Sequence, residues 1–173
     1  MKKIMIISDT HRNQVYLRRV FSNEENITHI FHLGDDYEDL DENPDLTEGK
    51  VLIRVPGIFH PGYLNKTIPI IQISNIEGWN CLLVHNRNDV LQKKTAVDIV
   101  CYGHTHIMNF EETHDTFYVN PGHLKRVRDK GQKPSYLILE LEGTEALFSF
   151  KSLDGKILKK FKKLRRINDN RRN

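Results

Sequence analysis

Short hydrophobic runs that stop at polar residues recur along this chain of 173 residues. The first run, residues 4–7, is rich in isoleucine and stops at Ser8, Asp9, Thr10 and His11. A run of this length and composition predicts a β-strand that is buried on both faces. Because open α/β sheets place their ligands at the carboxyl ends of parallel strands, Asp9 and His11 are the first candidates for binding a cation.

Three later runs end in the same way. Residues 28–33 stop at Gly34 and Asp35, residues 80–84 stop at His85, and residues 98–102 stop just before His104 and His106. One polar residue of this kind is more often a helix cap or a satisfied polar group. Its repetition at several strand ends predicts instead one shared metal site. Mixed Asp and His ligands favour Mn²⁺, with iron, zinc or nickel as alternatives.

The remaining pattern predicts further helices, strands and loops. Residues 13–21 have the periodicity of an amphipathic helix capped by Asn13, and residues 89–96 predict a short helix. Residues 66–74 and 80–84 are expected to pair as a hairpin through residues 77–79. Further strands are predicted at 51–55, 116–119, 136–141, 146–150 and 157–164. Loops are predicted at 58–66 and 111–115, and a loop with at most a short helix at 37–49.

The composition, 38% hydrophobic and 28% charged residues, is that of a soluble globular domain. No hydrophobic run approaches the roughly 20 residues of a membrane span, and none resembles the core of a signal peptide. We therefore expect a cytoplasmic protein without a membrane span. Cys81 and Cys101 each lie inside a hydrophobic run and have the pattern of buried small hydrophobic residues.

The net charge of +3 is unevenly distributed. From Lys156 onward the chain has nine basic residues and one acidic residue, Asp169, whereas acidic residues gather between residues 35 and 48. We divide the chain into a domain of residues 1–155 and a basic C-terminal strand or tail of residues 156–173. A solvated strand edge or helix face is the favoured interpretation of this tail. The alternative is a weak contact with the phosphates of a nucleic acid or with anionic lipid head groups.

Four sequence blocks together resemble a known family. SDTH, GDD, LVH and GHTH, in this order and spacing, are similar to the motifs of the calcineurin-like metallophosphoesterases, above all the small single-domain phosphodiesterases of bacteria and archaea. The resemblance covers about residues 1–142. It implies an α/β fold, a four-layer α/β/β/α sandwich of two mixed sheets flanked by helices, with a dinuclear metal centre at the strand ends.

The resemblance also implies roles for individual residues. One metal would be held by Asp9, His11, Asp35 and His106, and the second by Asp35, as a bridging carboxylate, with His85 and His104. Two divalent cations can clamp a phosphate ester and activate a hydroxide near neutral pH. The implied activity is that of a metal-dependent phosphoesterase, in particular a phosphodiesterase, acting on a small phosphate ester.

One block departs from the family pattern. Where the family has Gly-Asn-His-Asp or Gly-Asn-Cys-Asp, this chain has Gly57, Ile58, Phe59 and His60, and isoleucine has no donor atom for the second metal. In one interpretation His60, Asn86 or a water replaces the missing ligand. In a second, only the first metal binds tightly and activity is slow. In a third, the chain is a non-catalytic scaffold, as the retromer subunit with this fold is.

Other residues are candidates for contacts with the substrate. Arg12 follows a predicted ligand, and an arginine fork matches the oxygens of a phosphate, so Arg12 joins Asp35 and His60 as a predicted catalytic residue. The predicted substrate-binding residues are Arg12, Asn86, Arg87 and His123. His32 precedes a predicted ligand block, where it would pack or hydrogen-bond to a ligand.

Overall fold

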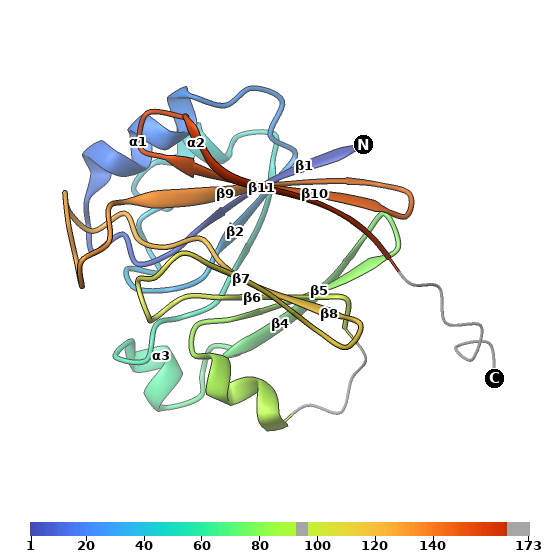
Figure 1. Cartoon of the computed structure of the whole chain (residues 1–173). Coiled ribbons are helices and arrows are strands. Elements are labelled where there is room, and N and C mark those ends of the chain that lie inside the picture. The colour runs from blue at the N-terminus through green and yellow to red at the C-terminus, as the bar shows by residue number, and fades with distance from the viewer. Residues whose placement is uncertain (93–96, 166–173) are drawn as a thin grey trace.

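Two β-sheets face each other in the computed structural model, which describes residues 1–92 and 97–165 (Figure 1). The first sheet has the strand order β11-β10-β9-β1-β2-β3. Its strands are β1 (Lys2–Ile7), β2 (His29–His32), β3 (Val51–Arg54), β9 (Ser135–Glu142), β10 (Glu145–Ser152) and β11 (Ile157–Leu164). Strands β1, β2 and β3 run parallel, and β9, β10 and β11 add antiparallel pairs, so the sheet is mixed.

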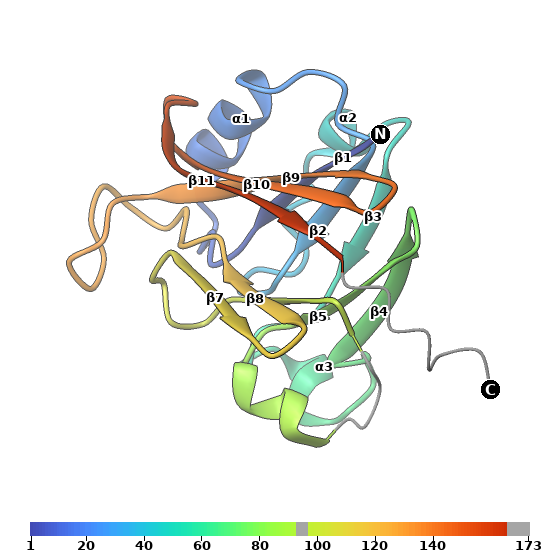
Figure 2. The same ribbon diagram turned by 45° about the vertical axis from the view of Figure 1, so that its right-hand side comes forward.

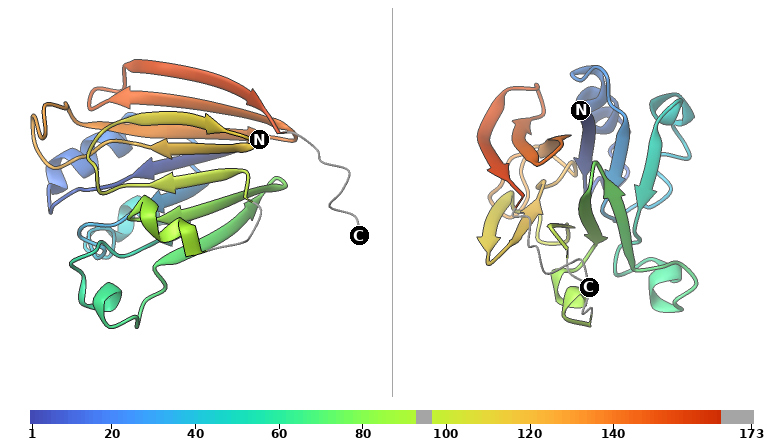
Figure 3. Two further views of the ribbon diagram at one scale, coloured as in Figure 1. Left: turned by 60° about the horizontal axis from the view of Figure 1, so that its bottom comes forward. Right: turned by 90° about the vertical axis from the view of Figure 1, so that its right-hand side faces the viewer.

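The second sheet is also mixed and has the order β4-β5-β6-β8-β7. Its strands are β4 (Ile71–Ile76), β5 (Trp79–Val84), β6 (Ile99–Tyr102), β7 (Asn109–Thr113) and β8 (Thr116–Asn120). Strands β5, β6 and β8 are parallel, whereas β4 and β7 pair antiparallel at the two edges. The strands of the two sheets have roughly aligned axes, as the left panel of Figure 3 shows.

Four short helical elements lie outside the two sheets: α1 (Gln14–Ser22), α2 (Pro44–Thr47), α3 (Pro61–Leu64) and the 3-10 helix η1 (Arg87–Gln92). Helix α1 packs Leu17 and Val20 against the outer face of the first sheet. On the opposite side, Val90 of η1 packs against the outer face of the second sheet. The predicted four-layer sandwich of two mixed sheets flanked by helices is therefore confirmed. The described helices all lack the length and apolar character that crossing a bilayer requires.

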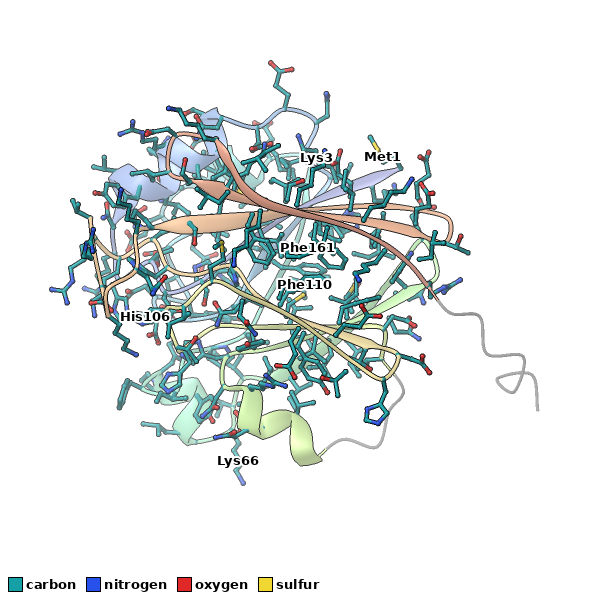
Figure 4. The ribbon with its side chains drawn as sticks, in the orientation of Figure 1. Met1, Lys3, Lys66, His106, Phe110 and Phe161 are labelled. Carbon is teal, nitrogen blue, oxygen red and sulfur yellow. The ribbon has the colours of Figure 1, made fainter. Side chains whose placement is uncertain are left out.

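The main hydrophobic core lies between the sheets. Trp79 and Phe148 are fully buried there, and burying a side chain of this kind typically contributes about 1.5–3 kcal/mol. At the open side of the sandwich, the rings of Phe110 on β7 and Phe161 on β11 stack with centroids 4.1 Å apart (Figure 4). An ion pair between Lys163 and Glu112 lies beside them. The edge strands of the two sheets are thereby joined.

Most predicted elements are present, and the exceptions have local reasons. Asn13 caps α1 as predicted, because its Oδ1 accepts a hydrogen bond from Tyr16 N at 3.1 Å. The predicted loop at 58–66 is wrong, since Pro61 begins the short helix α3 after the cap residue His60. The predicted loop at 111–115 is also wrong, because residues 109–113 form the edge strand β7. Of the helix predicted at 89–96, residues 93–96 lie outside the described residues.

Glu24, just beyond α1, connects that helix to three strands of the first sheet. Its side chain is only 2% exposed and lies 3.0 Å from Lys3 Nζ, and it accepts a hydrogen bond from Tyr136 Oη at 2.7 Å and another from Lys151. Burial alone would raise the pKa of Glu24, but the hydrogen bonds from Lys151, Tyr136 and Lys3 together lower it. The carboxylate is therefore more stable in the folded chain than in the unfolded one.

Glu24→Gln should reduce the free energy of unfolding at pH 7 by roughly 2 kcal/mol, because two partly buried ammonium groups lose their carboxylate partner. A carboxylate with a lowered folded-state pKa stabilises the fold fully above its unfolded pKa of about 4.3 and loses that contribution as the pH falls through the folded value. The difference between wild type and variant in urea unfolding should thus shrink from pH 7 to pH 3. Glu25→Gln, at the exposed neighbouring position, is the control and should change little. A difference independent of pH would contradict this account.

Candidate functional site

The six residues predicted as metal ligands all follow strands at one end of the sandwich. Asp9 and His11 follow β1, Asp35 follows β2, His85 follows β5, and His104 and His106 follow β6. Figure 4 shows His106 at the end of the molecule opposite Met1, the residue that precedes β1. The parallel directions of β1 with β2 and of β5 with β6 bring these carboxyl ends together.

Backbone hydrogen bonds fix the strand ends against each other. Asp9 N donates to Gly34 O at 3.0 Å, and Gly103 N donates to His85 O at 3.0 Å. Five of the six predicted ligands have a left-handed backbone, with φ between 48° and 66°: Asp9, His11, Asp35, His104 and His106. Such angles are uncommon outside glycine and store strain that the surrounding structure must compensate. This strain is concentrated at functional sites in other proteins.

Four of these residues form a compact group of donor atoms. One donor atom from each of Asp9, His11, Asp35 and His106 lies within 4.8 Å of the other three. His106 Nε2 is 3.1 Å from Asp9 Oδ1, and His11 Nε2 is 3.4 Å from Asp35 Oδ2. Ligand atoms about 2.1 Å from a common cation are themselves about 3–4 Å apart. The spacing therefore fits one cation of that size.

Asp35 directs its second oxygen toward the other predicted ligands. Its Oδ1 is 3.6 Å from His85 Nε2, and the rings of His85 and His104 have centroids 5.3 Å apart. One carboxylate thus faces a different imidazole with each oxygen, as a bridging ligand would. Gly57 makes this position accessible, because a Cβ atom there would lie 2.0 Å from Asp35 Oδ1.

Hydrogen bonds at Nδ1 fix the tautomers of two of the predicted histidine ligands. His85 Nδ1 lies 2.6 Å from Leu33 O, and His106 Nδ1 lies 2.5 Å from Asp129 Oδ2. A carbonyl or carboxylate oxygen can only accept, so each Nδ1 carries the hydrogen and each Nε2 can offer a lone pair to the site. Within the described part of the chain, the buried Nε2 of His85 has no hydrogen-bond partner. A metal ion would satisfy it, and these residues fit such an ion.

The site buries groups of like charge close together. Burial and the nearby Asp9 raise the pKa of Asp35. Burial would also raise the pKa of Asp9, but hydrogen bonds from His106 and Ser8 lower it. Burial would lower the pKa of His106, whereas Asp9 and Asp129 on its two sides raise it. A proton on His106 and a cation among the ligands therefore compete for the same nitrogen, so metal binding should release protons.

A cleft of about 510 Å³ lies next to this group. It is lined by His11, Arg12, Asp35, Asp36, Glu38, Gly57, Phe59, His60 and Pro61. The side chain of Arg12 is 85% exposed, with its Nε 3.3 Å from Asp36 Oδ1. His60 Nδ1 accepts a hydrogen bond from Gly62 N, so its Nε2–H donates to Glu38 Oε1 at 2.7 Å. The predicted catalytic residues Arg12 and His60 therefore lie in one cleft with two predicted ligands.

Three predicted substrate contacts are not brought to the cleft. Arg87 forms a two-pronged ion pair with Glu111, at 2.7 and 2.9 Å, and its guanidinium lies over the ring of Tyr118. Asn86 Oδ1 accepts a hydrogen bond from its neighbour Asn88 N. His123 is fully buried: Nε2 donates to Gln132 O, and Nδ1 accepts from Lys125 N. These bonds occupy Arg87 and both ring nitrogens of His123, and the role of all three residues in substrate binding stays a prediction.

Two residues that the sequence did not single out support the ligands. Asp129 holds the Nδ1 of His106, and it is 5% exposed. Ser8 donates its hydroxyl to Asp9 Oδ2 at 2.6 Å. The role of Ser8 could have been predicted from its position next to Asp9 in the sequence. Nothing in the sequence indicates the role of Asp129, because it is an isolated acidic residue in a loop, 23 residues away from His106 in the chain.

Sequence comparison identifies related proteins. The model of the calcineurin-like phosphoesterase superfamily domain matches residues 1–144. A phosphodiesterase of Methanocaldococcus jannaschii is 29% identical to this chain over 141 residues, which span 69% of this chain and 82% of the relative.

Solved structures share the fold. A phosphoesterase from E. coli superposes with a TM-score of 0.69 at 21% identity, covering 92% of this chain and 98% of that one. Wild-type Vps29 from Entamoeba histolytica, complexed with Zn²⁺, gives a TM-score of 0.66 at 22% identity, covering 94% and 98% of the two chains. The fold and the matched domain agree with the motifs at the strand ends. This chain belongs to the calcineurin-like phosphoesterase superfamily.

Proposed function

We propose that this protein is a metal-dependent phosphodiesterase with a site for two divalent cations, Mn²⁺ above all. The observation that carries the proposal is the convergence of Asp9, His11, Asp35 and His106 on one point beside an open cleft. His85 and His104, with the second oxygen of Asp35, would hold the other cation. Cations bound there would polarise a phosphate ester and neutralise part of its charge. Mixed carboxylate and imidazole ligands suit manganese, iron or zinc.

The chain's own residues would bind and orient the ester in the cleft. The exposed guanidinium of Arg12 can reach phosphate oxygens, and the carboxylate of Asp36 holds it at the rim. His60 is fixed as the cap of α3 and carries its proton on Nε2, which faces Glu38. Released from Glu38, that N–H could donate a hydrogen bond to the leaving oxygen as charge develops on it. His60 is therefore the proposed hydrogen-bond donor to the leaving oxygen, and Arg12 the proposed phosphate-binding residue.

The purified protein should hydrolyse bis-p-nitrophenyl phosphate when Mn²⁺ is added, and a chelator should abolish the reaction. Asp35→Asn should lower the rate by at least about 100-fold and reduce the bound metal, because it weakens the ligand that both cations would share. Asp45→Asn, at an exposed position paired with Arg18, is the matched control and should leave both unchanged. Initial rates and elemental analysis are the measurements. A wild-type protein that binds no transition metal would refute the proposal.

Asp129→Ala should weaken metal binding by roughly 10–100-fold, because His106 would lose the partner that fixes its tautomer. Asp129→Asn keeps an oxygen acceptor and should restore part of the affinity. Arg126→Gln removes the cation beside Asp129 but leaves the bond to His106, so it separates the two contacts. Competition with a chromogenic chelator measures the affinity without any substrate. Equal affinities in Asp129→Ala and wild type would show that His106 does not depend on Asp129.

A binding protein without catalytic activity is the second candidate function. It is favoured by Ile58, which offers no donor where the family has an asparagine ligand, and by the neighbouring Phe59, which is 81% exposed. Exposed aromatic side chains are frequent anchors in protein interfaces. In this case the metal site would remain, but its second half would be weak.

Ile58→Asn distinguishes the two candidates, because it supplies the missing donor. In a working enzyme with a weak second site, it should raise the rate or the content of the second metal severalfold. Ile58→Leu, which changes shape without adding a donor, is the control. Rates and metal content should be measured on the same samples. A metal-loaded wild type and a metal-loaded Ile58→Asn variant that are both inactive would favour the binding protein.

A further inference from the structure

A strongly basic loop lies against the predicted ligands, outside the residues that line the cleft. Residues 124–133, here called the basic loop, contain Lys125, Arg126, Arg128, Lys130 and Lys133. Their one acidic residue, Asp129, is buried. The loop connects β8 to β9 and projects from the body of the molecule in Figure 2, in light orange.

Several hydrogen bonds hold the basic loop at the site. Leu124 N donates to Asp9 O at 3.2 Å, and Asn13 Nδ2 donates to Lys125 O at 2.9 Å. Asp129 Oδ2 accepts the proton of His106 Nδ1. The loop is therefore bonded to two predicted ligands and to the cap residue of α1. His11 lines the cleft and lies 3.5 Å from His106, so the cleft and the loop adjoin the same ligand group.

The base of the loop has a fixed shape. Asp129 and Gln132 exchange backbone hydrogen bonds of 2.9 and 2.8 Å around a two-residue turn. The turn residues Lys130 and Gly131 both have positive φ, at 46° and 79°. The buried His123 donates a hydrogen bond from Nε2 to Gln132 O. The loop is thus ordered by its own bonds before any ligand arrives, which lowers the entropy lost on binding.

Most of the loop's positive charge is directed to solvent and has no acidic partner. Asp129 forms an ion pair with Arg126, and its Oδ1 lies 3.9 Å from Lys125 Nζ. Lys130 Nζ reaches only Thr105 O, at 3.5 Å. For the exposed Arg128 and Lys133, the described ranges 1–92 and 97–165 contain no ion-pair partner. On the cleft, in contrast, Asp36 pairs with Arg12, and Glu38 accepts a hydrogen bond from His60. The loop therefore carries the larger excess of unpaired positive charge.

We propose that the basic loop binds a second phosphate of the substrate, so that the protein prefers diesters that carry a further phosphate group beside the ester that is cleaved. This inference rests on the proposed function and names its substrate class. With the reacting phosphate at the ligands and Arg12 on the cleft side, the exposed cations of the loop attract further negative charge on their side. Both a nucleotide with two phosphates and a short single strand of nucleic acid have this chemistry.

Two esters of one nucleoside provide the test: thymidine 5′-(p-nitrophenyl phosphate) with and without a 3′-phosphate. The same bond is cleaved in both, so the ratio of their kcat/KM values reports the second phosphate alone. Wild type with Mn²⁺ should prefer the 3′-phosphorylated ester by about tenfold, through KM, because several exposed cations each contribute modestly. Arg128→Gln, Lys130→Gln and Lys133→Gln combined should bring the ratio toward one.

The matched control removes three positive charges elsewhere. Lys156→Gln, Lys159→Gln and Lys160→Gln lie on β11 or just before it, and all three side chains are exposed. This variant should keep the tenfold preference, since only the loop is bonded to the ligand group. A wild type without the preference, or an equal loss in both variants, would overturn the proposal.

Calorimetric binding of thymidine 3′,5′-bisphosphate separates this inference from the function on which it rests. The bisphosphate should bind about tenfold more weakly to the loop variant and equally well to the control variant. This result supports phosphate binding by the loop even if no ester is cleaved with any metal. If both esters are cleaved with equal kcat/KM, the second phosphate site on the loop is refuted, but the proposed phosphodiesterase activity is supported. Competition at equal phosphate concentration then assigns the source: a six-nucleotide single strand that inhibits better than the bisphosphate indicates a polymer, and equal inhibition indicates a small nucleotide. Both results uphold the loop.

Discussion

The meeting of four strand ends from two different sheets is the constraint on which the rest of the structure depends. Strands β1 and β2 belong to the first sheet and β5 and β6 to the second, and the bond between His85 Nδ1 and Leu33 O crosses from one sheet to the other. Because the sheets pack through a shared core, the position of each strand end is set by many buried contacts. The ligand group is therefore as rigid as the core beneath it.

This arrangement has an electrostatic consequence. Asp9 and Asp35 lie close together at the edge of the core, where water screens their repulsion poorly. His85 and His106 direct Nε2 to the site, because Leu33 O and Asp129 bind the N–H group on the other side of each ring. A cation at this position would attract both carboxylates and accept the lone pairs of the imidazoles. Burial lowers the pKa of His106, but Asp9 and Asp129 on its two sides raise it, so they favour a proton on this imidazole when no cation is bound.

Much of the fold and of the ligand group could be predicted from the sequence, because the signals are local. Residues 4–7 and 98–102 are hydrophobic runs with sharp ends, and the polar residues after them lie at the predicted edge. Strand β7 was missed because it is a partly exposed edge strand with one large hydrophobic residue, Phe110. Asp129 and the pairing of Arg87 with Glu111 depend on contacts between residues more than 20 positions apart. Such contacts exist only once the sheets have formed.

The left-handed backbone of the ligands restricts how this site can change by mutation. Asp, Asn, His and Gly tolerate such angles, whereas a β-branched residue is a steric outlier there. At Asp9 or Asp35, exchange for asparagine removes charge without disturbing the chain path, but exchange for isoleucine or valine would damage both the chemistry and the fold. Ile58 is not among the residues with positive φ, so a β-branched side chain has no such backbone penalty at that position. The block that departs from the family pattern is thus one where a donor can be lost while the scaffold stays intact, and we expect donor loss in such proteins to begin at positions of this kind.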